Sequence, residues 1–394
     1  MNGQMDIAAI AAEVAAAVGL AEGESGVLDV LLEVARHEPV ATSQIGRVTE
    51  LPVPIVAAVC NELRKRGVID RTRPVRLTEA GRAALGAQAG FLDLSCPCCD
   101  GLGLRIPDEL GPLTEQLEAA AAGAPQARVE LDQTHCTVST KIRRVLKLHQ
   151  AGALAGRNII LLGDDDLIAI AIARFCRLTG VATARLTVVD TDPAVLDWIG
   201  AQVAGNRTRV ELVEHDLRSP LPQSLQGGFD VACTDPPYTV PGATLFLSRA
   251  VSALAPRPGQ HVFFSFGARR PADTLATQRL IADLGLAVRS LTPGFNSYVG
   301  AGILAGTSNL YHLRTSDQAA PVTEGTYLGP LYTADSRAEQ SRPYRCASCG
   351  SEFLVGRAGA GGRAPEWEQI KDLQEAGCPS CGGHTFRPMP RRAR

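Results

Sequence analysis

The chain has 394 residues and a net charge of −2, and 45% of its residues are hydrophobic. This length accommodates two or three domains, and the near-neutral charge excludes an overall basic field that would attract nucleic acid or an anionic membrane. No uncharged apolar stretch reaches the roughly 20 residues of a membrane helix, and we expect no signal peptide because the N-terminus lacks a basic segment. With eleven cysteines in no secretory context, we expect a cytoplasmic protein with reduced thiols, some of them bound to metal.

Residues 1–90 are predicted to form a winged-helix-like domain. A lone alanine-rich helix covers 1–22, further helices cover 27–36, a segment from 42 or 43, and 54–66, and a β-ribbon precedes a closing helix from 78. In a winged helix that binds DNA, the third helix presents basic and amide side chains to the groove. Here the early part of that helix is apolar, from Ile55 to Val59. A docking or dimerisation module is therefore favoured over DNA binding, although the fold alone fixes neither function.

Residues 91–152 form a cysteine-containing connector. Cys96 and Cys99 have the spacing of half a zinc site, and Cys98, His135 or Cys136 are candidates for the missing ligands. The alternative is a group of free cysteines near a substrate loop.

A basic helix over 140–151 ends this connector. Its cations are expected to form a solvated helix face: Lys141, Arg143, Arg144 and Lys147.

Residues 153–315 alternate between strand and helix patterns. The predicted strands are 158–163, 185–190, 209–215, 229–234 and 260–266, followed by a strand pair at 286–291 and 308–314. The predicted helices are 167–179, 193–204, 243–255 and 272–284. Repeated units of this spacing predict an α/β fold with a doubly wound parallel sheet, which resembles the class I methyltransferase architecture. Residues 316–343, rich in small residues and proline, are predicted to be a linker around this domain.

The tail, 344–394, carries two cysteine pairs, each followed by glycine. Two such Cys-x-x-Cys pairs on glycine turns are the ligand set of a zinc ribbon, a closed structural site. The predicted zinc ligands are Cys346, Cys349, Cys378 and Cys381.

Two predicted strands of the sheet end in acidic residues. Gly163, Asp164, Asp165 and Asp166 follow the first strand, and Asp235 follows the fourth. Because ligands of open α/β sheets sit outside the carboxyl ends of the strands, both tips are expected to face one crevice.

The first tip lacks the glycine-rich turn that usually approaches phosphate or a methionine group in this fold. Three consecutive carboxylates would repel the carboxylate of S-adenosylmethionine by several kcal/mol if partly desolvated. They would attract a donor that carries only a sulfonium and an ammonium, such as decarboxylated S-adenosylmethionine. One of these acids, Asp165 or Asp166, is also placed to cap the following helix.

The second tip, Asp235-Pro236-Pro237-Tyr238, has the form found in amino-directed methyltransferases. The acid accepts hydrogen bonds from an attacking nitrogen and takes its proton, the prolines fix the direction of the turn, and the tyrosine covers the acceptor. Without a ligand, the same four residues are a plain turn.

Three further residues are candidates for nucleoside binding. Asp190, followed by Thr191, ends the second strand, where an acid usually binds the ribose hydroxyls. Asp216 follows the third strand, where the adenine amino group finds an acceptor. Either aspartate could instead cap the next helix.

Taken together, residues 25–315 resemble the branched-chain polyamine synthase family, also called N4-bis(aminopropyl)spermidine synthase. The resemblance rests on Gly163 to Asp166, Asp235 to Thr239, the winged-helix-like part, and the segments 296–298 and 308–311. It implies transfer of aminopropyl groups from decarboxylated S-adenosylmethionine to a spermidine-like polyamine, with release of methylthioadenosine, by a protein that forms a homodimer.

Carried over residue by residue, the resemblance assigns Gly163 to Asp166 to the aminopropyl and amine site. Asp190 and Asp216 would hold the nucleoside, and Asp235 with Tyr238 would bind the acceptor nitrogen.

Two other interpretations compete. One is an amino-directed methyltransferase that uses intact S-adenosylmethionine, which the missing glycine-rich turn disfavours. The other is a nucleoside-sensing regulator built from the winged helix and the ribbon, which the near-zero net charge and the apolar third helix disfavour.

Overall fold

The computed structural model describes residues 5–86, 96, 98–99, 101–206, 208–267, 270–300, 306–332, 342–355, 367 and 370–389. They fall into two compact units. The first contains the N-terminal helices and a seven-stranded sheet, and the second contains the four-cysteine segment with the short stretches 130–132 and 237–242. None of the helices within these described ranges combines the length and the hydropathy needed to cross a membrane.

The N-terminal part folds around its own hydrophobic core. Its helices are α1 (Ile7–Val18), α2 (Gly23–His37), α3 (Thr42–Thr49), α4 (Val53–Lys65) and α5 (Glu79–Leu85). An antiparallel bridge joins Ile69 to Leu77 in a small β-ribbon after α4, and a second bridge joins Val75 of this ribbon to Val40, which lies between α2 and α3. Two of the apolar residues early in α4, Val56 and Val59, are fully buried in this core. The apolar early part of α4 therefore serves packing.

The central sheet has the order β3-β2-β1-β4-β5-β7-β6. The first five of these strands are parallel, and β7 runs antiparallel to β5 and β6. This arrangement confirms the predicted α/β fold with a mostly parallel sheet. The strands are β1 (Asn158–Leu162), β2 (Arg185–Asp190), β3 (Val210–Glu214), β4 (Val231–Thr234), β5 (His261–Phe266), β6 (Leu286–Ser297) and β7 (Thr307–Thr315). β6 continues six residues beyond the predicted end at 291, through two irregularities in its register with β7.

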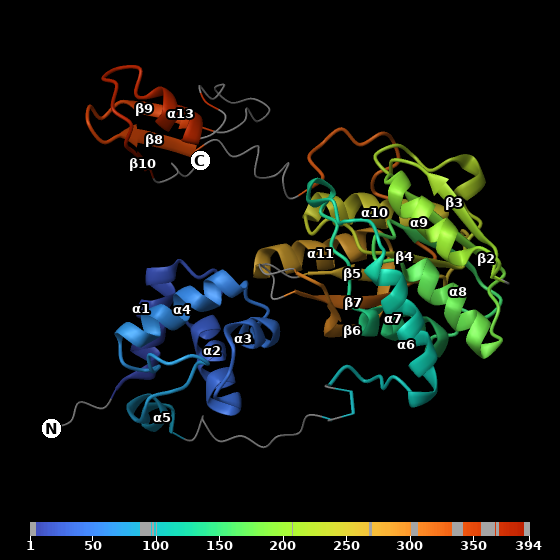
Figure 1. Ribbon diagram of the computed structural model, residues 1–394, viewed down its shortest axis with the longest axis horizontal. Helices are drawn as coiled ribbons and strands as arrows, with labels where there is room; N and C mark the ends of the chain where they lie inside the picture. Colours follow the sequence, from blue (N-terminus) through green and yellow to red (C-terminus); the bar gives the residue numbers. More distant parts are fainter. Residues whose placement is uncertain are drawn as a thin grey trace. The chain divides into compact units, whose positions relative to one another are not determined.

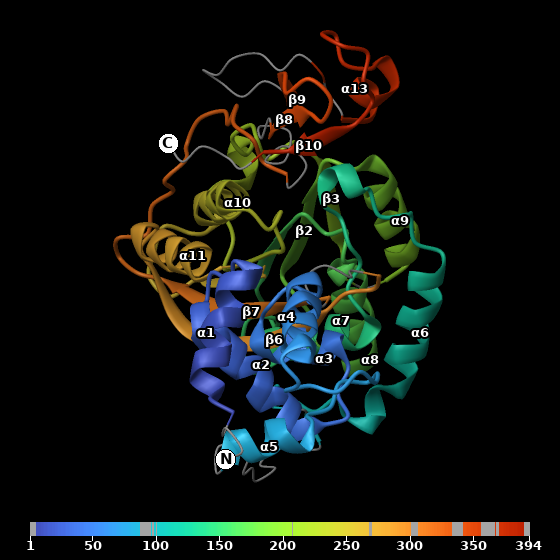
Figure 2. The same ribbon diagram turned by 90° about the vertical axis from the view of Figure 1, so that its left-hand side faces the viewer.

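Helices cover both faces of the sheet, so β1 is buried almost throughout. Figures 1 and 2 show α7, α8 and α9 on one face, with α6 outside them, and α10 and α11 on the other. Their bounds are α6 (Gly111–Ala122), α7 (Val138–Gln150), α8 (Ile168–Thr179), α9 (Pro193–Val203), α10 (Val240–Ala253) and α11 (Pro271–Asp283). Short 3-10 turns are η2 (Asp108–Leu110), η3 (Val129–Leu131) and η4 (Gln223–Leu225).

The four-cysteine segment forms a separate three-stranded antiparallel sheet with the order β10-β8-β9. It consists of β8 (Arg342–Cys346), β9 (Glu352–Val355), α13 (Ile370–Ala376) and β10 (Phe386–Pro388). Phe353 and Phe386 meet edge to face, with ring centroids 5.9 Å apart, and Leu373 is fully buried beside them. This core is small, which is typical of a domain that needs additional crosslinks.

A buried arginine on α10 holds the first part of the predicted linker against the sheet domain. Arg249 is 1% exposed, and its guanidinium donates hydrogen bonds to backbone carbonyl groups only. These carbonyls belong to two segments, 217–218 and 323–325, at distances of 2.7 to 3.2 Å. The first segment directly follows Asp216. Arg249 therefore ties the loop after β3 to the chain that leaves the sheet domain.

Replacing Arg249 with methionine should lower the free energy of unfolding by about 3 kcal/mol, because five backbone carbonyls lose their buried donor. Urea denaturation measures this loss, and hydrogen exchange should show faster exchange at 320–326. Arg279→Met, an exposed change on α11, is the matched control and should stay within about 0.5 kcal/mol of the wild type. An Arg249→Met protein as stable as this control would contradict the anchoring role.

Candidate active site

The strand order reverses between β1 and β4, which are neighbours in the centre of the sheet. Parallel α/β sheets bind ligands at this position, outside the carboxyl ends of the strands. Gly163 and the three aspartates follow β1, and Asp235 follows β4, so the two predicted acidic tips do meet. Gly163 has a φ of 75°, a backbone conformation that glycine adopts without strain. A pocket beneath the tips is lined by polar groups of Arg144, Asp166 and Asp235 and by apolar groups of Phe263 and Leu310.

Asp164 caps helix α8. Its two carboxylate oxygens accept hydrogen bonds from the N–H groups of Ile168 (2.7 Å) and Ala169 (2.9 Å). The prediction that Asp165 or Asp166 would cap this helix is therefore wrong. The reason is the backbone of Leu167, which has a φ of 57°, so the chain turns back and brings Asp164 to the helix N-terminus.

Asp166 is paired with Arg144, which lies on α7. The guanidinium Nη1 is 2.7 Å from Oδ2 of Asp166, and Nη2 is 2.7 Å from Oδ2 of Asp235. Arg144 thus bridges the acidic tips of β1 and β4. It is only 8% exposed, so solvent screens these contacts weakly.

Polar residues from the end of the sheet hold Arg144 and Asp235 in place. Asn296 accepts a hydrogen bond from Nε of Arg144 at 2.7 Å. The Tyr298 hydroxyl donates to Oδ2 of Asp235 at 2.6 Å and lies 2.8 Å from the hydroxyl of Ser308. Because Asn296 and Ser308 are buried, this network leaves the Arg144 and Asp235 side chains little freedom to move.

The connector before α7 forms another wall of the site. The Thr134 N–H donates to Oδ2 of Asp165 at 3.0 Å, and the Cys136 N–H donates to Oδ1 of Asp166. Lys141, 2% exposed, donates from Nζ to the backbone carbonyl of Asp166. Residues 134–141 therefore bind the first acidic tip through both its backbone and its side chains.

The expectation of a solvated basic face on α7 is wrong for Lys141 and Arg144, which are both buried. A signal for this was present, because Lys141, Arg144, Val145 and Leu148 have the spacing of one helix face, and the last two are apolar. Cations on an apolar stripe indicate buried partners. The expectation of three uncompensated aspartates in the crevice needs the same correction, since Asp164 caps a helix and Asp166 is ion-paired.

The other predicted nucleoside residues lie at the expected strand ends. Asp190 is 6% exposed, and its carboxylate accepts hydrogen bonds from the N–H groups of Asp164 and Asp192, both at 2.9 Å. Thr191 beside it is exposed. Asp216 is exposed too and accepts a hydrogen bond from the Arg218 N–H at 2.9 Å. Asp190 therefore connects the loops after β1 and β2 through backbone contacts.

The remaining predicted site residues follow Asp235 in the chain. Pro236 is buried and is the last residue of the stretch Gln133–Pro236 of the first unit. Tyr238 lies in 237–242, which groups with the second unit. The role of Tyr238 stays a prediction.

Burial raises the pKa of each of these carboxyl groups, and the charged partners decide whether the net shift is upward or downward. Burial raises the pKa of Asp164 to about 8 and that of Asp235 to about 7, the latter against the attraction of Arg144. The pKa of Asp165 is raised by burial and by the charge of Asp166. Burial acts upward on Asp166 as well, but Arg144 and Lys141 outweigh it and its pKa is lowered. Asp166 is therefore the more stably ionised member of the pair that shares Arg144.

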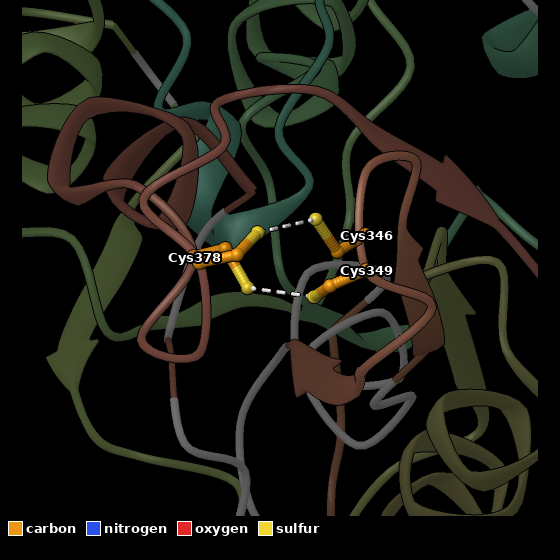
Figure 3. Close-up of side chains that lie close together, drawn as sticks. Cys346, Cys349 and Cys378 are labelled. Carbon is orange, nitrogen blue, oxygen red and sulfur yellow. Dashed lines mark hydrogen bonds between the residues drawn. The ribbon is translucent and has the colours of Figure 1, made fainter.

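The predicted metal ligands come together in the second unit. The four thiols of Cys346, Cys349, Cys378 and Cys381 lie within 4.8 Å of one another. Figure 3 shows Cys346 and Cys349 on one loop, opposite Cys378. The Sγ atoms of Cys346 and Cys381 are 3.7 Å apart, and those of Cys349 and Cys378 are 3.6 Å apart. Ligands about 2.3 Å from a tetrahedral zinc would be about 3.8 Å apart, so this group fits a zinc ion.

The first cysteine group gives a different result. Cys96, Cys98 and Cys99 belong to no metal-binding group among the residues that the structure describes. Cys136, one suggested partner, is buried beside Lys141, with 3.7 Å between Sγ and Nζ.

Comparison with known proteins extends this description. Residues 112–324, more than half of the chain, match the family model described as the branched-chain polyamine synthase A C-terminal domain. An uncharacterized protein of Methanocaldococcus jannaschii is 32% identical over 388 residues, which cover 96% of this chain and 92% of that protein. The N(4)-bis(aminopropyl)spermidine synthase of the same organism is 29% identical over 294 residues, covering 72% of this chain and 81% of the relative.

A solved structure shares the architecture. The branched-chain polyamine synthase of Thermus thermophilus, crystallised with N4-aminopropylspermidine and 5'-methylthioadenosine, superimposes with a TM-score of 0.65 at 26% identity. The match covers 84% of this chain and 97% of that structure. The recognition made from the sequence is thereby confirmed: the chain belongs to the branched-chain polyamine synthase family and is an enzyme of the transferase class.

Proposed function

We propose that this enzyme transfers the aminopropyl group of decarboxylated S-adenosylmethionine to an amine nitrogen of a spermidine-like polyamine and releases methylthioadenosine. The observation that carries this proposal is the meeting of two acidic strand tips at the switch point of the sheet, in a family of polyamine synthases. The ligands of the Thermus thermophilus relative are an aminopropylated polyamine and methylthioadenosine, which are the kinds of product that this reaction yields.

The charge of the crevice supports a cationic donor. Six aspartates lie at or just after the ends of β1, β2 and β4, and two buried cations, Lys141 and Arg144, face them within the described chain. Acidic groups thus outnumber cations even after the pairing of Asp166. A sulfonium and an ammonium would be attracted to this excess, whereas the carboxylate of intact S-adenosylmethionine would add to it.

The aminopropyl transfer needs an in-line arrangement of three atoms. A neutral amine nitrogen attacks the carbon next to the sulfonium, a C–N bond forms, and the C–S bond breaks with its electron pair retained by sulfur. The new ammonium then gives its proton to Asp235. We assign this step to Oδ1, because Arg144 and Tyr298 engage Oδ2 of the same carboxylate.

The remaining site residues are assigned to the donor. Asp165, whose Oδ2 accepts a single N–H from Thr134, would bind the ammonium of the aminopropyl group through Oδ1. Asp190 would take the ribose hydroxyls and Asp216 the adenine amino group, both from the ends of their strands. Tyr238 would cover the acceptor amine.

Asp165→Asn and Asp235→Asn should each reduce turnover by at least a hundredfold, because one removes a charge that holds the donor and the other removes the base. The assay incubates the enzyme with decarboxylated S-adenosylmethionine and spermidine and detects methylthioadenosine and the aminopropylated product by mass spectrometry. Asp283→Asn, an exposed change at the end of α11, keeps the net charge equal to that of the variants and should be fully active. Methylated amine formed from intact S-adenosylmethionine, with no aminopropyl transfer, would overturn the proposed function.

We also propose a winged-helix-like module for the N-terminal part, in which the ribbon that joins Ile69 to Leu77 after α4 is the wing. Because the early residues of α4 are committed to the core, docking or dimerisation is its proposed role.

The second unit is proposed to be a structural zinc ribbon. Its core is small, and each cysteine pair is followed by a glycine with positive φ, Gly350 or Gly382, which lets backbone N–H groups turn toward the thiols. Zinc would link the loop after β8 to the loop after α13 and add stability that the apolar core lacks.

Elemental analysis of the purified protein should find one zinc per chain. Cys349→Ser should remove the metal and raise hydrogen exchange across 342–355 and 370–389, while exchange in β1 and β4 stays unchanged. Cys98→Ser, an exposed cysteine outside this group, is the control and should retain the zinc. Full protection of the ribbon in metal-free protein would contradict the structural role.

A further inference from the structure

Arg144 is one guanidinium shared by two buried carboxylates. Its terminal nitrogens lie 2.7 Å from Asp166 and 2.7 Å from Asp235, and its Nε is occupied by Asn296. The side chains of both aspartates are at most 12% exposed. A buried pair of carboxylates with a single cation between them has one negative charge without a partner, and such a charge is costly in a protein interior.

In the part of the chain that the structure describes, the groups around this pair do not supply the missing cation. From α7, Lys141 directs its ammonium to the backbone carbonyl of Asp166 and to the thiol of Cys136. From β6, Tyr298 contributes a neutral hydroxyl. The Cys233 thiol of β4 lies in the same pocket.

The loop after β1 and the end of β2 add further acidic groups beside this pair and no cation. These are the carboxyl groups of Asp164, Asp165 and Asp190, all of which have raised pKa values because of burial. The unmatched charge therefore has two possible partners, a proton or a cationic ligand.

We infer that Arg144 positions Asp166 and Asp235 as a pair one positive charge short, and that the sulfonium donor fills this deficit in exchange for a proton on Asp235. The inference rests on the proposed function, because it names decarboxylated S-adenosylmethionine as the cation. Arg144 is a positioning residue in this scheme, since it touches the two acids rather than the reacting atoms.

The direction of the pKa shifts agrees with this assignment. Burial raises the pKa of Asp235 to about 7, whereas Arg144 and Lys141 keep the pKa of Asp166 low. The shared proton therefore resides on Asp235 in the free enzyme below pH 7. A sulfonium beside this carboxyl group favours its ionised form and expels the proton.

This exchange makes the base available only when the donor is bound. With the donor in place, Asp235 is ionised and can accept the proton of the attacking amine. Transfer converts the sulfonium into neutral methylthioadenosine and returns one proton to Asp235. The total charge of the site is thus the same before and after the transfer, because the proton on Asp235 replaces the positive charge of the sulfonium.

The test compares the cationic donor with neutral methylthioadenosine, which lacks the sulfonium charge and the aminopropyl group with its ammonium. Isothermal titration calorimetry of the wild-type enzyme at pH 6.5, in buffers of different ionisation enthalpy, measures protons released on binding. Decarboxylated S-adenosylmethionine should release most of one proton, and methylthioadenosine should release none. Affinity for the donor should rise about tenfold between pH 6 and pH 8, because only the ionised form of Asp235 binds it well, while affinity for methylthioadenosine stays constant.

Variants separate positioning from folding. Asp235→Asn should release fewer protons than the wild-type enzyme on binding the donor, and its affinity should not show the tenfold rise between pH 6 and pH 8. Arg144→Gln should move the midpoint of that rise to higher pH, because both acids lose their cation. Arg144→Lys keeps a positive charge and should therefore shift the midpoint less. Arg143→Gln makes the same charge change one residue away on α7 and should leave the midpoint where it is in the wild type.

The outcomes distinguish this inference from the proposed function. Equal proton release and equal pH dependence for the two nucleosides would overturn the exchange while leaving aminopropyl transfer intact. Failure of the wild-type enzyme to bind either nucleoside would instead overturn the proposed function. Since the wild-type comparison alone decides between these results, the test does not depend on the stability of any variant.

Discussion

The contact on which the site depends is a single guanidinium between two acidic strand ends. β1 and β4 are neighbours whose carboxyl ends each carry aspartate at the switch point of the sheet. Without a cation between them, Asp166 and Asp235 would repel each other in a buried place, and the two loops would separate. Arg144 prevents this and also connects α7 to Asn296 on β6. One side chain thereby sets the relative position of two strand ends, a helix and the antiparallel edge of the sheet.

Much of the fold could be predicted because its signals are local. The three central strands β1, β2 and β4 are short, mostly buried apolar runs that end in or shortly before an aspartate, so their ends and their common edge can be predicted from the sequence. The clustering of the four cysteines could be predicted too, since two Cys-x-x-Cys pairs on glycine turns are typical of one shared site, and their thiols lie within 4.8 Å of one another.

The polar partners could not be predicted in the same way. Arg144 is 91 residues from Asp235 and 152 from Asn296, and no local pattern encodes such pairings. The cap by Asp164 depends on a left-handed residue at Leu167, a conformation that leucine rarely adopts and that composition does not indicate. Charge alone predicts that Lys141 and Arg144 are solvated. Their place on the apolar stripe of α7 indicates instead that they are buried, as the structure shows.

These pairings leave the expected donor unchanged but change the physical reason for its selection. Three free aspartates would have attracted any cation, including metal ions and the solvent's own counter-ions. The observed site is more restrictive, because Asp164 is committed to α8, Asp166 to Arg144, and Asp190 to the backbone of two loops. In the proposed function, the carboxyl groups left for a ligand are those of Asp165 and Asp235, which follow adjacent strands. A donor whose ammonium and sulfonium are separated by a short alkyl chain is suited to two such points, whereas a neutral nucleoside has no positive charge to offer either.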